Sequence, residues 1–215
     1  MLVEGNVFER NWAQAQNGFA ILFTVRNQDG HAPWSVVEDV TFAGNVVRDS
    51  GAGINLLGRD SRKGFESGQT QRISIRDNRF ERLGGPWGGN GTFLQLLEGT
   101  DGVVVEHNTA LQGGSVLVAE GAPHRGFVFR SNLVLHNEYG IVGSGTAAGS
   151  PTLAAFFPGA VVVGNLFVGG VPASYPPGNS FASSLDEVFE GQGRGQPRAS
   201  WSDVGARTPA PTALH

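Results

Sequence analysis

The sequence predicts an all-β fold, a right-handed parallel β-helix in which each coil of the chain contains three short strands. Three observations predict it. One short phrase with a central asparagine recurs six times, strand-like segments flank each asparagine, and turn-forming residues are abundant. The 215 residues include 33 glycines and 11 prolines, which leaves little room for long helices. A solenoid of about six coils with an asparagine ladder accounts for all three observations.

The asparagine of the phrase marks one corner of every coil. Successive copies are 39, 33, 30, 24 and 33 residues apart, so the shortest interval indicates the bare unit and the longer ones indicate the same unit with an inserted loop. Asparagine tolerates the left-handed backbone of a sharp bend, and stacked amides can hydrogen-bond along the axis. The alternative, ordinary turn asparagines of a β-sandwich, does not explain the shared flanking pattern. The six residues are Asn6, Asn45, Asn78, Asn108, Asn132 and Asn165.

Three groups of strands are expected around these corners. One group precedes each asparagine with alternating apolar residues, as in residues 73–76, and another follows it at once, as in residues 46–47. The third group is often led by glycine and comprises residues 19–25, 53–57, 92–97, 115–118 and 139–142. Hairpins would need two-residue turns between equal strands, whereas a single corner asparagine between unequal strands favours a bend.

The phrase resembles the repeat of right-handed parallel β-helix proteins of the pectate-lyase-like superfamily, in which an asparagine ladder lies between the second and third strands. The resemblance covers about residues 2–170, and it implies that the glycine-led strands form the first sheet. Lyases, hydrolases, esterases and non-enzymes share this solenoid, so the resemblance specifies fold more than chemistry. No complete lyase or polygalacturonase motif is present. Residues 18–30 and 136–141 are similar to bacterial β-helix proteins without an activity that carries over.

Two regions are expected along the chain. Residues 1–170 form the parallel β-helix, and residues 171–215 form an irregular C-terminal wrap with a flexible tail, because the apolar pattern fades there. The spacing from Ser184 to Glu187 is that of a capping box and predicts one helical turn. The chain opens at a second strand without a cap, which favours a C-terminal portion of a longer helix. Its uncapped coil end could support end-to-end association or an oligomer.

Composition argues against several classes of protein. A net charge of −4 without a Lys/Arg cluster argues against nucleic acid as a partner. No apolar run approaches the roughly 20 residues of a membrane span, and the absence of cysteine excludes disulfides and thiolate chemistry. The start has no export signal, whereas the resemblance implies a secreted or periplasmic protein, so localisation stays open.

The resemblance places a substrate groove outside the first sheet, flanked by the loops at the ends of its strands. The residues of this sequence that match that region are charged or aromatic, and tryptophan rings can stack on sugars. The candidate catalytic residues are Arg26, Arg59, Asp60 and Glu98. The candidate binding residues are Asp29, Glu120, His124, Trp12, Trp34 and Trp87.

Coil spacing gives the candidate carboxylates a geometry. Equivalent positions of adjacent coils are roughly 4.8 Å apart, so Asp60 and Glu98, taken as neighbours, are expected about 5 Å apart. That separation suits a retaining glycosidase or two metal ligands sharing a calcium ion. In a lyase a cation or arginine would neutralise the uronate, and the resemblance implies Arg59 or Arg26 as the base, although an ordinary arginine is a poor base. Alternatively, these charges are solvated loop pairs worth under about 1 kcal/mol.

The sequence therefore predicts a carbohydrate-active protein, a polysaccharide lyase or glycoside hydrolase that acts on acidic polysaccharide. The alternative is a non-catalytic solenoid that binds polysaccharide or is structural, or an inactive fragment of a larger enzyme.

Overall fold

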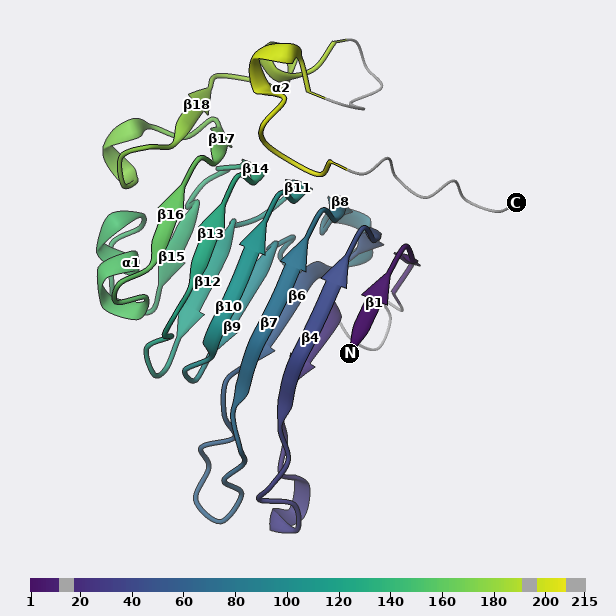
Figure 1. Ribbon diagram of the computed structural model, residues 1–215, viewed down its shortest axis with the longest axis vertical. Helices are drawn as coiled ribbons and strands as arrows, with labels where there is room; N and C mark the ends of the chain where they lie inside the picture. Colours follow the sequence, from purple (N-terminus) through teal and green to yellow (C-terminus); the bar gives the residue numbers. More distant parts are fainter. Residues whose placement is uncertain (12–17, 191–196, 208–215) are drawn as a thin grey trace.

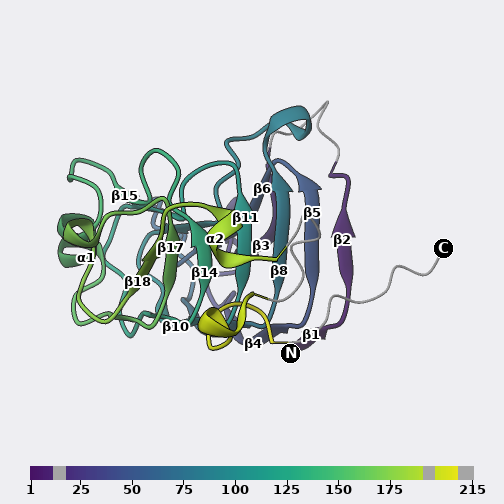
Figure 2. The same cartoon turned by 90° about the horizontal axis from the view of Figure 1, so that it is seen from above.

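The computed structural model describes residues 1–11, 18–190 and 197–207, and it confirms the predicted right-handed parallel β-helix with three strands per coil (Figures 1 and 2). Every ladder between the named strands is parallel, and each strand pairs with its counterpart in the next coil. The strands therefore form three sheets that run the length of the stack.

The three sheets contain the strand groups that the sequence predicts. The first sheet consists of β3 (Phe19–Thr24), β6 (Ala52–Leu57), β9 (Leu94–Leu97), β12 (Leu117–Glu120) and β15 (Ile141–Gly143). The second consists of β1 (Leu2–Glu4), β4 (Val37–Ala43), β7 (Thr70–Arg76), β10 (Asp101–Glu106), β13 (Val128–Arg130) and β16 (Val161–Val163). The third consists of β2 (Val7–Glu9), β5 (Val46–Ser50), β8 (Arg79–Leu83), β11 (Thr109–Gln112), β14 (Leu133–Leu135), β17 (Leu166–Val168) and β18 (Ser180–Ala182).

The helices are short, and they lie between strands or after the last strand, β18. They are the 3-10 turns η1 (Gln28–Gly30), η2 (Gly85–Trp87), η3 (Pro172–Ser174) and η4 (Ala199–Trp201), and the α-helices α1 (Ser150–Phe156) and α2 (Leu185–Val188). Helix α2 is the helical turn predicted after Ser184. The capping partner of Glu187 is Ser183 and not Ser184, because Glu187 accepts hydrogen bonds from the N–H and the hydroxyl of Ser183. Among the described residues, no helix combines the length and the apolarity needed to cross a bilayer.

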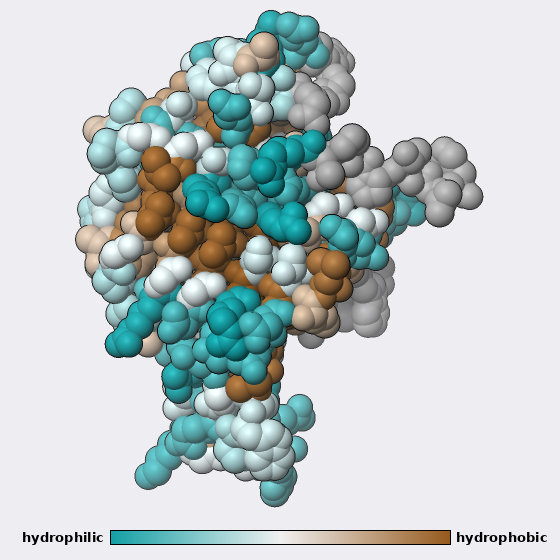
Figure 3. Space-filling model, in the orientation of Figure 1, coloured by the Kyte–Doolittle hydropathy of each residue, from teal (hydrophilic) through white to brown (hydrophobic). Residues whose placement is uncertain are grey.

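The core is a stack of apolar side chains in register inside the coils. One inward row runs across the second sheet through Phe42, Ile75, Val105, Phe129 and Val162, all of them buried. Helix α1 packs Leu153 and Phe156 into the same cluster at the β15 end of the stack. Because strand side chains alternate, the other residues of the second sheet face outward. Over β10, β13 and β16 this outer face is an apolar band (Figure 3) that includes the exposed Val161 and Val163.

The asparagines form the ladder that the sequence predicts. In each step the backbone N–H and the side-chain Nδ2 of one asparagine both donate to the Oδ1 of the next, at 2.9 to 3.1 Å. Each Nδ2 from Asn45 onward also donates to a backbone carbonyl of a second-sheet strand in the preceding coil, as Asn108 does to Ile75. Asn165 continues the ladder to Asn179, which is a seventh member.

The bend itself is made one residue earlier than expected. The prediction that the asparagine itself has the left-handed backbone conformation is wrong, because no ladder asparagine has a positive φ. The residue before it does: Gly5, Gly44, Asp77, His107, Ser131, Gly164 and Gly178 all have φ between 52° and 85°. Since this preceding residue turns the chain, the asparagine amide is free to point along the axis and pair with its neighbours.

The chain beyond residue 170 continues the stack and then turns back. Strand β18 extends the third sheet past β17, and residues 197–207 run back over the outer side of that sheet towards β11 and β8 (Figure 1). Trp201 and Val204 pack there against a cluster that contains Leu133 and Leu166. The predicted wrap is therefore held against the helix at its described residues.

Candidate functional site

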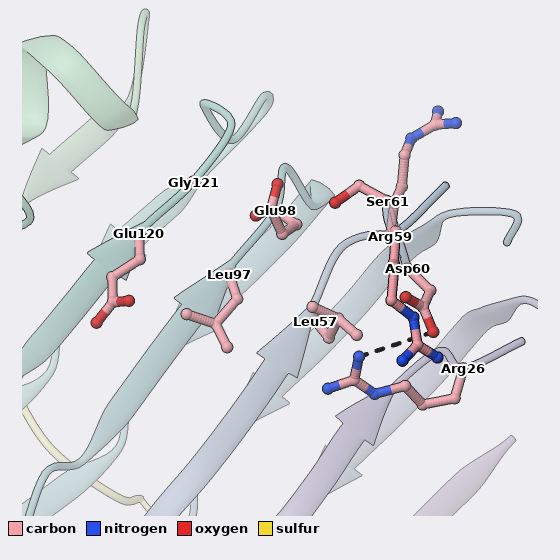
Figure 4. Close-up of a pocket in the computed structure, with 10 residues that line it drawn as sticks. Arg26, Leu57, Arg59, Asp60, Ser61, Leu97, Glu98, Glu120 and Gly121 are labelled. Atoms are coloured by element: carbon pink, nitrogen blue, oxygen red, sulfur yellow. Dashed lines mark ion pairs between the residues drawn. The ribbon is translucent and has the colours of Figure 1, made fainter. Parts of the chain in front are cut away.

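A depression lies at the C-terminal edge of the first sheet, where β6, β9 and β12 end (Figure 4). Its volume is about 390 Å³. The floor is apolar, because Leu57 and Leu97 are register partners that face outward from β6 and β9. The residues that line it are Arg26, Leu57, Arg59, Asp60, Ser61, Arg62, Leu97, Glu98, Glu120 and Gly121.

One wall of the depression is built from two stacked loops, residues 25–36 and 58–69, which project together from the body (Figures 1 and 3). The buried Asn27 joins them by donating from Nδ2 to the carbonyl of Glu66 at 2.7 Å. The N–H of Gly68 donates to the carbonyl of Ser35 at 2.9 Å. Gly30 is required here, since an added Cβ would lie 2.6 Å from the Gly64 carbonyl oxygen. The two loops therefore form one cross-linked unit.

Asp60 and the arginines give this wall its charge. The Asp60 side chain is 7% exposed and lies 3.7 Å from the guanidinium of Arg26, which is 62% exposed (Figure 4). The backbone N–H of Asp60 donates to the hydroxyl of Ser67 at 2.8 Å, which fixes the loop at this point. Arg59 donates to Gln69 at 2.9 Å, and Arg62 lies 3.8 Å over the ring of Phe65. One guanidinium, that of Arg26, thus pairs with the largely buried Asp60 carboxylate, while Arg59 and Arg62 are held by Gln69 and Phe65.

Glu98 occupies a different level of the depression from Asp60. The register of β6 with β9 pairs Leu57 with Leu97, so Glu98 lies opposite Gly58. Its carboxylate rests against Gly121, where an added Cβ would be 2.6 Å from Oε1. Figure 4 shows the side chain apart from the Arg26–Asp60 pair. The two predicted carboxylates therefore line one depression without being equivalent residues of adjacent coils.

This arrangement does not fit the expected calcium site. Calcium takes six to eight oxygen ligands, and no group of three or more acidic or histidine side chains that could hold a metal occurs among the described residues. Asp60 is engaged by Arg26 and Glu98 faces Gly121.

The other predicted binding residues are spread over the molecule. Glu120 lines the depression and Asp29 is exposed on η1. Trp34 is 75% exposed in the first of the two stacked loops, whereas Trp87 is half-buried in η2, at the opposite end of the first-sheet strands. Neither tryptophan lines the depression. Trp12 lies outside the described residues.

His124 lies in the core instead of the depression. Its ring is fully buried, stacks on Phe157 at 4.9 Å and accepts a hydrogen bond from the N–H of Thr100 at 3.0 Å. Burial lowers its pKa to about 4, although the backbone carbonyl of Leu96 acts in the opposite direction. His124 is therefore a neutral packing residue.

Several residues of the site were not predicted from the sequence. Leu57, Leu97 and Arg62 are in the lining, and an amide pair lies next to the floor, with Asn55 donating to Gln95 at 2.6 Å. Asn55 and Gln95 are register partners on the outer face of the first sheet. Their signal in the sequence is a polar residue at an alternate position of an otherwise apolar strand, as in Ile54-Asn55-Leu56.

Comparison of the chain with protein-family models, with curated proteins and with solved structures gave no match. The class of protein is therefore defined by its own structure. It is a right-handed parallel β-helix with a charged depression at the C-terminal edge of the first sheet.

Proposed function

We propose that this protein is a carbohydrate-active β-helix that binds an acidic polysaccharide in the depression. The observation that carries the proposal is the lining itself, in which Arg26, Arg59 and Arg62 line the depression together with an apolar floor of Leu57 and Leu97. Guanidinium groups bind carboxylates with paired hydrogen bonds. An apolar floor with a few polar groups at its margin is typical of a ligand site.

The amide pair supports a sugar as the ligand. Asn55 and Gln95 adjoin the floor, and amides can both donate to and accept from hydroxyl groups. A uronate residue carries one carboxylate and several hydroxyls, so it matches both parts of the site. This is also the ligand class that the resemblance to the pectate-lyase-like superfamily implies.

Titration calorimetry tests the binding. An oligogalacturonate is expected to bind, and the same oligosaccharide with its carboxyl groups reduced to alcohols is expected to bind at least about tenfold more weakly, because the charge-assisted hydrogen bonds are lost. Arg26→Ala combined with Arg59→Ala should weaken binding of the acidic oligosaccharide by a similar factor. The control is Arg72→Ala, an exposed arginine of the second sheet. Equal affinity for both oligosaccharides, or unchanged affinity in the double variant, would contradict the proposal.

Catalysis at the same depression is a second candidate, favoured by one observation, the largely buried Asp60 carboxylate beside Arg26. Elimination from a uronate needs one base and one group that neutralises the substrate carboxylate, so it requires no pair of carboxylates at fixed separation. On this hypothesis Asp60 or Arg59 removes the proton, Arg26 neutralises the uronate, and Glu98 protonates the leaving oxygen.

A panel of polysaccharides distinguishes the reactions. Unsaturated-uronide absorbance together with new reducing ends indicates a lyase, and reducing ends alone indicate a glycoside hydrolase. Binding without either product indicates the non-catalytic alternative. If the protein is a lyase with Asp60 as its base, Asp60→Asn should abolish product formation while the melting temperature stays close to that of the wild type, and if Arg59 is the base, Arg59→Ala should do so instead.

A further inference from the structure

The returning C-terminal segment makes specific contacts with the corner between the second and third sheets. The N–H of Gly205 donates to the carbonyl of Ser131 at 2.9 Å, and the N–H of Ala206 donates to the hydroxyl of Thr109 at 2.9 Å. We call residues 197–207 the strap. Since Ser131, Thr109 and Asp77 belong to three successive coils, the strap runs along the axis and bridges all three.

The end of the strap is fixed by a bidentate ion pair. The Nε and one terminal nitrogen of Arg207 donate to the two carboxylate oxygens of Asp77 at 2.8 and 2.9 Å. The Asp77 side chain is 8% exposed, whereas the Arg207 side chain is 56% exposed, so a carboxylate that is largely buried is paired with a guanidinium that solvent still reaches. The backbone N–H of Arg207 adds a longer bond to Asp77 at 3.3 Å. Arg207 is thus the latch of the strap.

A histidine lies directly beside this latch. His107 is the counterpart of Asp77 in the next coil, and both residues have the left-handed conformation that precedes a ladder asparagine. Its Nδ1 is buried and has no hydrogen-bond partner among the described residues. A neutral imidazole can leave a buried Nδ1 without a hydrogen-bond partner, but in a protonated imidazole Nδ1 carries a proton and needs a hydrogen-bond acceptor.

We propose that residues 197–207 form a releasable strap latched by Arg207 on Asp77, and that protonation of His107 opens it by competing with Arg207 for the Asp77 carboxylate. The step moves one proton from solvent to the imidazole and exchanges one ion pair for another. Opening uncovers the side of the third sheet on which Trp201 and Val204 pack.

The charges around the latch set the direction of the pH dependence. Burial lowers the pKa of His107 and the positive charge of Arg207 lowers it further, while Asp77 and Glu106 act in the opposite direction and Arg130 adds to the lowering. For Asp77, burial raises the pKa, but the hydrogen bonds from Arg207 outweigh it and His107 also contributes to the net lowering. Arg76 also lies 3.4 Å from Asp77.

Acid is therefore expected to open the strap. The closed state disfavours a proton on His107. The closed strap is therefore most stable relative to the open strap at pH values above the ordinary histidine pKa of about 6.5, and this stability falls as the pH drops below that value. Asp77 acts in the same sense at lower pH, because its ionised form is the one that binds Arg207. Protonation of either group weakens the latch.

Amide hydrogen exchange at Gly205 and Ala206 measures opening directly, because both amides are bonded only while the strap is closed. After correction for the intrinsic exchange rate, protection should fall from pH 7 to pH 5 by up to about tenfold per pH unit, the limit for uptake of one proton. Arg207→Gln should lower protection about tenfold or more at pH 7. His107→Gln should keep the strap closed and remove the pH dependence between pH 7 and 5.

A matched control is Arg72→Gln, which removes another bidentate arginine–aspartate pair between adjacent coils, with Asp39, far from the strap. Protection at Gly205 and Ala206 should not change in this variant. The proposal is overturned if Arg207→Gln leaves that protection at the wild-type value. It is also overturned if His107→Gln retains the full acid dependence, which would assign the effect to Asp77 or to the body of the protein.

Discussion

Truncating one buried member of the asparagine ladder should destabilise the protein far more than truncating the member at its edge. Asn108 is fully buried. Its Oδ1 accepts from the N–H and the Nδ2 of Asn78, and its Nδ2 donates to Asn132 and to the carbonyls of Ile75 and Glu106. Asn108→Ala removes all of these bonds at once.

The magnitude follows from the groups left behind. The N–H of Asn78 and the carbonyl of Ile75 lose partners in the interior, and each buried polar group without a hydrogen bond costs about 1–3 kcal/mol. The free energy of unfolding should therefore fall by about 3–5 kcal/mol. Asn6 is exposed, and within the part of the chain that the structure describes its side chain donates to Asn45 and to the carbonyl of Glu4 but accepts no hydrogen bond. Asn6→Ala should cost less than about 1 kcal/mol.

Urea unfolding followed by far-ultraviolet circular dichroism measures both variants. The midpoint should shift strongly for Asn108→Ala and little for Asn6→Ala, with similar slopes if the coils unfold together. If both variants lose the same stability, or if Asn108→Ala loses less than about 1 kcal/mol, the ladder does not stabilise the corner as argued here.

Two further predictions concern packing and pH. In Gly53→Ala the new Cβ would lie 2.4 Å from the carbonyl oxygen of Phe93, so thermal unfolding should show a loss of about 1–3 kcal/mol. The matched Gly18→Ala, whose Cβ meets no atom of the described residues within 4 Å, should unfold at nearly the wild-type temperature. Because burial lowers the pKa of His124 to about 4, stability should decline as pH falls from about 6.5 towards 4, by about 3 kcal/mol at most. Nuclear magnetic resonance should find His124 neutral at pH 5.5, and a protonated ring there would contradict its assignment to the core.

The fold could be predicted because its signal is local and repeated. Each ladder asparagine stands between two strands, and this pattern survives loops of different lengths. Asn179 was missed, although Gly178-Asn179 repeats the Gly164-Asn165 dipeptide. The strand signal before it is interrupted by Pro176 and Pro177, and the strand after it has only three residues.

The site could be predicted only in outline. Arg26, Arg59, Asp60, Glu98 and Glu120 all line one depression, because strands of one sheet end at one edge. The pairing of Asp60 with Glu98 was not available from the sequence, since Asp60 lies in a loop beyond the register that β6 and β9 share. Loop residues lack the alternation of apolar and polar side chains that shows which residues of a strand face inward. The burial of His124, a loop residue, could therefore not be deduced from the sequence either.

The most direct test of the parallel stacking is cross-linking, since the chain has no cysteine of its own. Ser74 and Val104 are register partners on the outer face of the second sheet, and Val128 is the partner of Val104 one coil further on. Adjacent strands are about 4.8 Å apart, within the Cα separation that a disulfide spans, and the next strand at about 10 Å is beyond it. Ser74→Cys with Val104→Cys should therefore oxidise to an intramolecular disulfide, and Ser74→Cys with Val128→Cys should not. Efficient oxidation of the second pair, or none in the first, would contradict the parallel β-helix.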